Sequence, residues 1–384
     1  MPLFDVKNVT LADLQSLIDE QVFENKELEY KDYSFLNGKL PPQTKDKFPK
    51  EIAAFANTNG GIIIIGMKED DNRLPTEITG TGMSLADFDE WLSSFRQVIL
   101  SRIRPHLHGV ECKPVKLDDT NIAIVISVPK SYSRPHSVWD GNKDEFFMRY
   151  ANGVAYMDID DLRREFLYSS VTQEKIRNFR RDRYAMILAN ECIGDLGNGG
   201  KLVFHIIPEW SFELGNSIDL TRLERRDFRP LTGSSWNHRF NADGYCLYST
   251  PDYRSNQIKT YTQFFHNGIV EATEIRLISN YQHQVVYDWR PLQDALIKSL
   301  KGYGGHLEYC GVPKPWHITG AFLNVRGYVT TAWGGTSEPI DRDIVISQEG
   351  ICTDEVSMES AMKPVFDSLS NAFGLGFSSY FYQS

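Results

Sequence analysis

The spacing of hydrophobic residues changes between strand and helix periods along this chain, and residues 27–33 have the strand period. Leu28 and Tyr30 occupy one side of that strand, because successive side chains of a strand point to opposite faces. The other side carries three charged residues, Glu27, Glu29 and Lys31. The segment therefore predicts a strand with one buried and one charged face.

A helix and a second strand are predicted next. Phe48, Ile52 and Phe55 recur at helical spacing, and Asn59-Gly60-Gly61 is typical of a helix end. The apolar run over 62–65 predicts a buried strand. Four charged residues follow at its carboxyl end, where mixed sheets often keep their polar chemistry: Lys68, Glu69, Asp70 and Asp71.

The remainder of the first half continues this mixed pattern. Helices are predicted over 11–18 and 84–103, strands over 121–128 and 147–150, and another helix from Ile159. An arginine-rich helix over 172–191 is interpreted as a solvated linker, and the glycines of 194–200 as a boundary. The prediction is a first domain over 1–170, a helical linker over 171–198 and a second domain over 199–384.

The second half predicts an α+β domain rich in antiparallel strands. Asn267-Gly268, the strongest turn signal, lies inside a hairpin predicted over 261–278. Further strands are expected over 202–206, 245–248, 321–329 and 343–347, and helices over 292–300 and 358–373. Five aromatic residues in loop-like sequence form either a partner-recognition surface or part of the core: Trp236, Tyr253, Trp289, Trp316 and Trp333.

Composition and charge limit the function classes. Of the 384 residues, 41% are hydrophobic, and the net charge is −10. This charge argues against general coating of nucleic acid or of an anionic membrane, so a nucleic-acid surface must be local. The five cysteines lie far apart without metal-ligand spacing, which favours a reducing cytoplasm. No apolar run approaches the ~18 residues of a membrane span, so neither export nor membrane attachment is expected.

Three motifs of the first half resemble the Schlafen-type AlbA-like domain family. They are ENKELEYK over 24–31, AFANTNGGIIIIG over 54–66 and FFMRYANGVAYMDIDDL over 146–162, and they follow the family's order. The resemblance covers residues 1–170 and implies the family's mixed sheet with helices.

The resemblance also implies an active site. In nuclease members, the glutamates at the first and sixth positions of the first motif and an aspartate just after the second motif are the catalytic carboxylates; here the glutamates are Glu24 and Glu29. Lys68 stands at the aspartate position, so Glu69 and Asp70 become candidates for the third carboxylate. The implied cofactor is Mn²⁺ or Mg²⁺, held by Glu24, Glu29 and Asp70, with Lys31 assisting. Carboxylate oxygens suit these ions. The alternative is that the glutamates are solvated charges.

Six basic residues are candidate phosphate contacts: Lys45, Lys47, Lys50, Arg134, His136 and Arg149. The lysines are interleaved with the apolar stripe of the predicted helix. Arg134 and His136 lie in a segment, SYSRPH, that looks like the family's short basic stretch with proline. Phosphate contacts of this kind position a nucleic acid without reading its sequence. A merely solvated loop is the alternative.

Two function classes remain open. In the first, the chain is a metal-dependent endoribonuclease acting on tRNA or other structured RNA, with DNA as the alternative substrate. The resemblance places such effectors in anti-phage defence, and the second domain would then sense a phage or host protein. In the second class, the chain is a non-catalytic DNA-, RNA- or ATP-binding regulator, although no GxxxxGK[ST] loop is present. A homo-oligomer is compatible with both. Glu69 or Asp70 beside Glu24 and Glu29 would favour catalysis, and Lys68 in that place would favour binding.

Overall fold

The computed structural model describes residues 6–33, 44–150, 153–213, 215–224, 229–232, 236–250, 256–275, 278–281, 284–287, 289–332 and 335–382. The chain divides into two compact units, residues 1–171 and 172–384. The division falls inside one long helix, α4 (Ile159–Leu188). Both units combine helices with sheets, so the predicted α+β class is confirmed.

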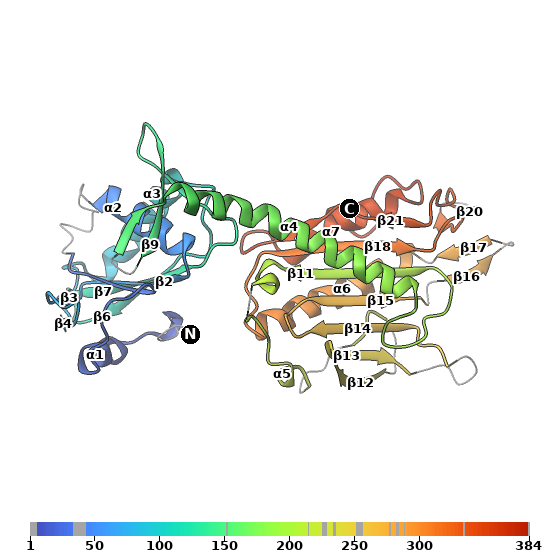
Figure 1. Ribbon diagram of the computed structural model, residues 1–384, viewed down its shortest axis with the longest axis horizontal. Helices are drawn as coiled ribbons and strands as arrows, with labels where there is room; N and C mark the ends of the chain where they lie inside the picture. Colours follow the sequence, from blue (N-terminus) through green and yellow to red (C-terminus); the bar gives the residue numbers. More distant parts are fainter. Residues whose placement is uncertain are drawn as a thin grey trace. The chain divides into compact units, whose positions relative to one another are not determined.

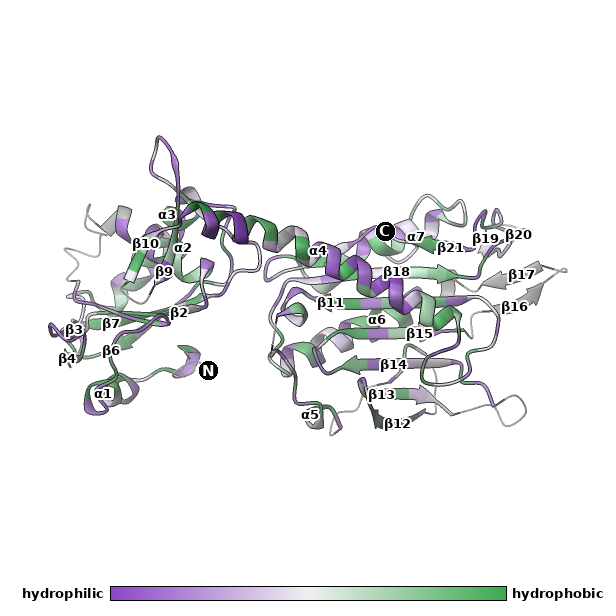
Figure 2. Cartoon of the chain, viewed as in Figure 1, coloured by the Kyte–Doolittle hydropathy of each residue, from purple (hydrophilic) through white to green (hydrophobic). Residues whose placement is uncertain are grey.

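Unit 1 is built around a four-stranded mixed sheet in the order β1-β2-β7-β6 (Figure 1). Its strands are β1 (Leu28–Lys31), β2 (Gly60–Ile65), β6 (Glu111–Lys116) and β7 (Ile122–Pro129). β1 and β2 run parallel, with Glu29 opposite Ile63, and the other pairs are antiparallel. Figure 2 shows that β2 and β7 are hydrophobic along most of their length. Such strands are typical of a sheet that is covered on both faces.

The strand period distributes the isoleucines of β2 between two cores. Ile62 and Ile64 pack with α1 (Leu11–Asp19), whereas Ile63 and Ile65 pack with α2 (Thr44–Asn57) and α3 (Phe88–Arg102). Each face of the sheet is therefore sealed by a different set of helices.

A second, antiparallel sheet lies beside α2 in unit 1. Its order is β10-β9-β8-β5, and its strands are β5 (Ile103–Arg104), β8 (Ser137–Trp139), β9 (Asp144–Tyr150) and β10 (Gly153–Tyr156). The buried amide of Asn57, at the end of α2, donates hydrogen bonds of 2.9 Å to the carbonyls of His136 and Phe147. These bonds fix β9, and with it Arg149, against the helix.

The remaining elements of this unit are η1 (Val6–Asn8), η2 (Leu85–Asp87), β3 (Lys68–Glu69) and β4 (Pro75–Glu77).

Unit 2 is organised around a large antiparallel sheet in the order β12-β13-β14-β15-β11-β18-β21, with β22 also paired to β18. The strands are β11 (Lys201–Pro208), β12 (Trp236–Asn241), β13 (Gly244–Ser249), β14 (Thr260–Phe265), β15 (Val270–Glu274), β18 (Trp316–Leu323), β21 (Ile344–Ile346) and β22 (Gly350–Cys352). The predicted hairpin is β14–β15, and Gly268 in its turn has a φ of 82°, which favours glycine. The strand expected over 321–329 instead ends at Leu323.

Helices cover both faces of this sheet. On one face, α6 (Trp289–Tyr309) and α7 (Met358–Asn371) form the main core, in which the rings of Trp289 and Phe366 stack. On the other face, Tyr184 and Ile187 of α4 are buried against the sheet. Residues 172–188 thus pack within unit 2, whereas the arginine-rich pattern had predicted a solvated linker over 171–198. Shorter elements are η3 (Glu209–Phe212), α5 (Thr221–Glu224), β16 (Ile278–Tyr281), β17 (Gln284–Tyr287), β19 (Thr331–Ala332) and β20 (Gly335–Thr336).

The three described aromatic residues among the candidates for a recognition surface pack in or against the core. Trp289 and Trp316 are fully buried, and Trp236 is partly buried against the same cluster. Tyr253 and Trp333 lie outside the described residues. None of the helices in the described ranges combines the length and apolar character that crossing a bilayer requires.

Candidate active site

Four carboxylates and two cations gather around β1 in unit 1. The carboxylates, called here the carboxylate cluster, are Glu24 before β1, Glu29 on β1, Glu51 on α2 and Glu69 on β3. The cations are Lys31 on β1 and Arg149 on β9. The parallel pairing of β1 with β2 and the helix α2 between them bring these distant segments together.

Glu29 is buried and both of its carboxylate oxygens are paired. Nη2 of Arg149 donates to Oε2 of Glu29 at 2.6 Å, and Nζ of Lys31 pairs with the other oxygen. Arg149 also reaches Glu51 at 3.3 Å and the carbonyl of Asn25 at 3.0 Å. Its guanidinium lies 4.1 Å from the ring centre of Phe55. Arg149 therefore connects β9 with Glu29 of β1, with α2 and with the segment before β1. Its guanidinium is occupied by these contacts and is not free to contact a phosphate.

Glu24 has a pKa near neutrality. Its Oε1 accepts a hydrogen bond of 2.6 Å from the backbone N–H of Tyr30. Burial, together with the nearby charges of Glu29 and Glu69, raises the pKa of Glu24 to about 7. A carboxyl with this pKa can exchange a proton with a substrate or with water near neutrality.

Glu69, and not Asp70, is the third acid that the structure brings to the cluster. The charge of Glu69 contributes to the raised pKa of Glu24, and its buried Oε2 has no hydrogen-bond partner among the described residues. Asp70 is exposed and caps the β3–β4 turn, where its Oδ1 accepts from the backbone N–H groups of Asn72 and Leu74 at 2.8 and 2.9 Å. These hydrogen bonds lower the pKa of Asp70. Lys68 is exposed.

Glu51 belongs to the cluster although the sequence analysis did not propose it. Burial and the charge of Glu29 raise the pKa of Glu51. Its position three residues after Phe48 and four before Phe55 places it at the edge of the apolar stripe of α2. A carboxylate at the edge of an apolar stripe is uncommon, and this is the feature of the sequence that could have indicated Glu51.

Lys31 remains protonated in this environment. Burial alone would lower its pKa, but the carboxylates of Glu29 and Glu51 outweigh that effect and raise the pKa above the ordinary value. Lys31 is therefore a fixed positive charge next to the carboxylates.

Two of the proposed phosphate contacts, Arg134 and His136, are buried and engaged within the fold. Arg134 pairs with Glu165 at 2.6 Å. His136 contacts the carbonyl oxygen of Pro105 at 2.7 Å and Oγ of Ser131 at 2.6 Å, and burial lowers its pKa. The structure therefore corrects the interpretation of SYSRPH as a basic loop open to phosphate.

The α2 lysines are the remaining basic candidates. Lys47 is exposed, and Lys50 is partly buried, with its Nζ 3.7 Å from Glu145 and 5.1 Å from the ring centre of Phe147. The side chain of Lys45 lies outside the described residues.

The carboxylate cluster can be tested for donors that suit the expected Mn²⁺ or Mg²⁺ ion. No group of three or more histidine, cysteine, aspartate or glutamate residues is placed to hold an ion within the described ranges. However, Mg²⁺ is often bound by one or two carboxylates together with substrate phosphates. Glu24 and Glu69 fit that arrangement, because a buried oxygen of Glu69 is unpaired and negative charge is crowded at Glu24.

The family comparison covers this site. Residues 24–158 match the family model described as Schlafen, AlbA_2. This region belongs to that family. The match confirms the resemblance found in the sequence, and the Schlafen AlbA_2 region contains the whole carboxylate cluster with Lys31 and Arg149. It supports a nucleic-acid-binding or nuclease-like function for the region.

Solved structures with low sequence identity also match. The DIP2311 protein from Corynebacterium diphtheriae is 21% identical over 38% of this chain and 26% of its own, with a TM-score of 0.26. The N-terminal domain of a RecG-related protein from Nitrosomonas europaea is 18% identical over 38% of this chain and 86% of its own, also with a TM-score of 0.26. The chain thus spans about a quarter of the DIP2311 protein. No curated protein matches the chain.

Proposed function

We propose that the Schlafen AlbA_2 region is an endoribonuclease that cleaves structured RNA, such as tRNA, at the carboxylate cluster. The observation that carries this proposal is that Glu69 lies near Glu24 and Glu29. Glu69 would thus supply the third carboxylate, which nuclease members have as an aspartate at the position of Lys68. RNA is the substrate that the resemblance implies, with DNA as the alternative. A role in anti-phage defence is an expectation from the resemblance.

The side chains of the cluster have distinct roles in this proposal. Lys31, which stays protonated, would neutralise charge on the scissile phosphate. Glu29 holds Lys31 in place and is itself fixed by Arg149. Glu24, whose pKa lies near 7, can ionise at neutral pH, as a carboxylate that holds a metal ion must. Mg²⁺ or Mn²⁺, held by Glu24 and Glu69, would supply further charge neutralisation and a more acidic bound water.

Nucleic-acid binding without cleavage is the second candidate. It is favoured by the pairing of both Glu29 oxygens, since this carboxylate is not free for a metal ion. Exposed Lys47 on α2 and exposed Lys68 on β3 would then provide phosphate contacts.

A nuclease assay separates the two candidates. The full chain is incubated with tRNA, single-stranded RNA and DNA, each with Mg²⁺, with Mn²⁺ and with chelator. The proposal expects cleavage of tRNA in the presence of a divalent ion. Retention of the nucleic acids in a binding assay without cleavage of any of them would favour the binding module.

A further inference from the structure

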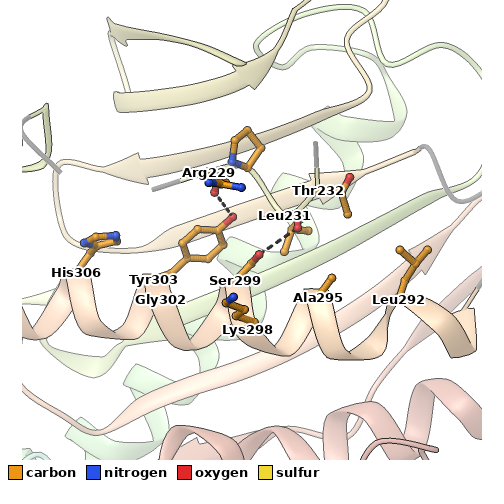
Figure 3. A pocket seen from close by; sticks show the side chains of 11 residues that line it. Arg229, Leu231, Thr232, Leu292, Ala295, Lys298, Ser299, Gly302, Tyr303 and His306 are labelled. Carbon is orange, nitrogen blue, oxygen red and sulfur yellow. Dashed lines mark hydrogen bonds between the residues drawn. The ribbon is translucent and has the colours of Figure 1, made fainter. Parts of the chain in front are cut away.

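Unit 2 contains a pocket of about 520 Å³ along one side of α6. Its helical wall is a stripe of residues three or four positions apart, from Leu292 through Ala295 and Ser299 to His306. The opposite wall is the segment 229–232 (Figure 3). The volume lies within the range of small-molecule sites.

Hydrogen bonds fix the two walls of this pocket to each other. The hydroxyl of Tyr303 donates to the carbonyl of Arg229 at 2.7 Å, and the hydroxyl of Ser299 donates to the carbonyl of Leu231 at 3.0 Å (Figure 3). Tyr303 is itself buried and also hydrogen-bonded to Thr262 at 2.9 Å. The pocket is therefore formed by anchored groups, which reduces the ordering cost of binding.

The charged residues that line the pocket, Arg229 and Lys298, are both basic, and the imidazole of His306 also lines it. No aspartate or glutamate lines it among the residues that the structure describes. This is unusual for a chain with a net charge of −10. Lys298 has no ion-pair partner in the described part of the chain, and the guanidinium of Arg229 lies 5.3 Å from the ring centre of Trp236. Arginine and lysine together are typical of phosphate recognition.

Gly302 keeps the middle of the pocket open. It lies inside α6, where a glycine costs about 1 kcal/mol relative to alanine. Gly304 of the same helix is explained by packing, because a Cβ there would lie 3.2 Å from Trp316. At Gly302 a Cβ would meet nothing within 4 Å, so packing does not require this glycine, and a side chain there would project into the pocket.

We propose that this pocket binds a phosphorylated small molecule of about mononucleotide size. Arg229, Lys298 and His306 would contact the phosphate. Leu231, Leu292 and Ala295, toward the amino-terminal end of the stripe, would contact the uncharged part of the ligand. The site lies wholly within unit 2 and is independent of the proposed nuclease activity.

Calorimetric titration of the full chain tests this inference. The probes are the mononucleotides AMP, GMP, CMP and UMP, the sugar phosphate glucose 6-phosphate, and inorganic pyrophosphate. We expect at least one organic phosphate to bind more tightly than pyrophosphate. Gly302→Leu should weaken that binding about tenfold or more, whereas Gly305→Leu should not, since Gly305 is equally open but does not line the pocket.

Charge variants provide the second arm. Lys298→Gln should weaken binding several-fold, while Lys301→Gln should leave it unchanged, because Lys301 pairs with Glu359 outside the pocket. The inference is overturned if none of the probes binds, or if binding survives Gly302→Leu. Pyrophosphate binding as tight as that of every organic probe would indicate a cationic surface only and would also overturn it.

Discussion

Arg149 and Glu29 form a buried ion pair between residues 120 positions apart in the sequence, with 2.6 Å between Nη2 and Oε2. This pair connects β9 of the small sheet to β1 of the mixed sheet, and it fixes the oxygen atoms around which the carboxylate cluster is arranged. The proposed active site is therefore part of the packing of unit 1, and changes to its two best-buried charges should affect stability as well as activity.

Arg149→Met should destabilise the protein strongly. The variant removes one of two counter-charges of buried Glu29, while Lys31 stays beside the other oxygen. Breaking a buried pair that has no second counter-charge costs about 3–5 kcal/mol, so the loss expected here is up to about 3 kcal/mol. The urea midpoint of the full chain should fall accordingly. Lys116→Met is the control, because Lys116 pairs with Asp119 in full solvent. Equal midpoints for the parent and Arg149→Met would contradict the structural role given to this arginine.

Glu24→Gln should stabilise the protein at alkaline pH but not at acid pH. The folded-state pKa of Glu24 is raised to about 7 from 4.5, so the folded chain holds a proton that the unfolded chain releases, and stability falls as pH rises between these values. Because Glu24 is only partly buried, the gain expected in the variant at pH 8.5 is about 1 kcal/mol. Urea unfolding of both proteins at pH 4 and pH 8.5 measures it. A difference that does not change with pH would refute the raised pKa.

Mn²⁺ should raise the melting temperature of the parent, and more at pH 8 than at pH 6. An ion that binds the folded state stabilises it by mass action, and the carboxyl of Glu24 must be ionised to hold it. Glu69→Gln should remove this gain, while Glu77→Gln, an exposed residue on β4, should keep it. The assignment of the ion to Glu24 and Glu69 fails if Glu69→Gln and the parent respond alike.

Nucleic acid should bind unit 1 through α2. Lys47→Gln and Lys50→Gln should each weaken RNA binding several-fold and reduce the slope of log affinity against log salt by about 1, as expected for the loss of one phosphate contact. Arg134→Gln should instead lower stability, because it leaves buried Glu165 without this partner. Filter binding at several salt concentrations measures the RNA affinity and its salt slope for each variant. If both lysine variants have the same salt slope as the parent, RNA does not bind through α2.

Much of the fold follows from local pattern. The isoleucine run of β2, the helical stripe of α2 and the Asn267-Gly268 hairpin are each set by side-chain period or turn chemistry within a few residues. Helix α4 was harder, because its charged surface resembles a linker, while burial of Tyr184 and Ile187 depends on a sheet formed by later residues.

The site was only partly predictable, because some of its contacts are set by local sequence and others join residues far apart in the chain. Glu24, Glu29 and Lys31 lie in one motif, and Glu69 follows the next strand, so the sequence proposed them as one site, and the structure places them near one another. Asp70 was proposed as a metal ligand, but its carboxylate forms local hydrogen bonds in a turn. The burial of Arg149 depends on its ion pairs with Glu29 and Glu51, which are more than 90 residues away in the sequence, so no local pattern around Arg149 predicts it.

The most direct measurement is the rate at which the full chain cleaves structured RNA when Glu69 is changed. Parent, Glu69→Gln and the control Glu77→Gln are compared at neutral pH with Mn²⁺, after circular dichroism has shown that all three are folded. The proposed site predicts that Glu69→Gln lowers the rate about 100-fold or more, as for loss of a catalytic acid-base or metal-holding group, while Glu77→Gln cleaves like the parent. If Glu69→Gln cleaves as fast as the parent, Glu69 is not the third carboxylate and the proposed active site is wrong.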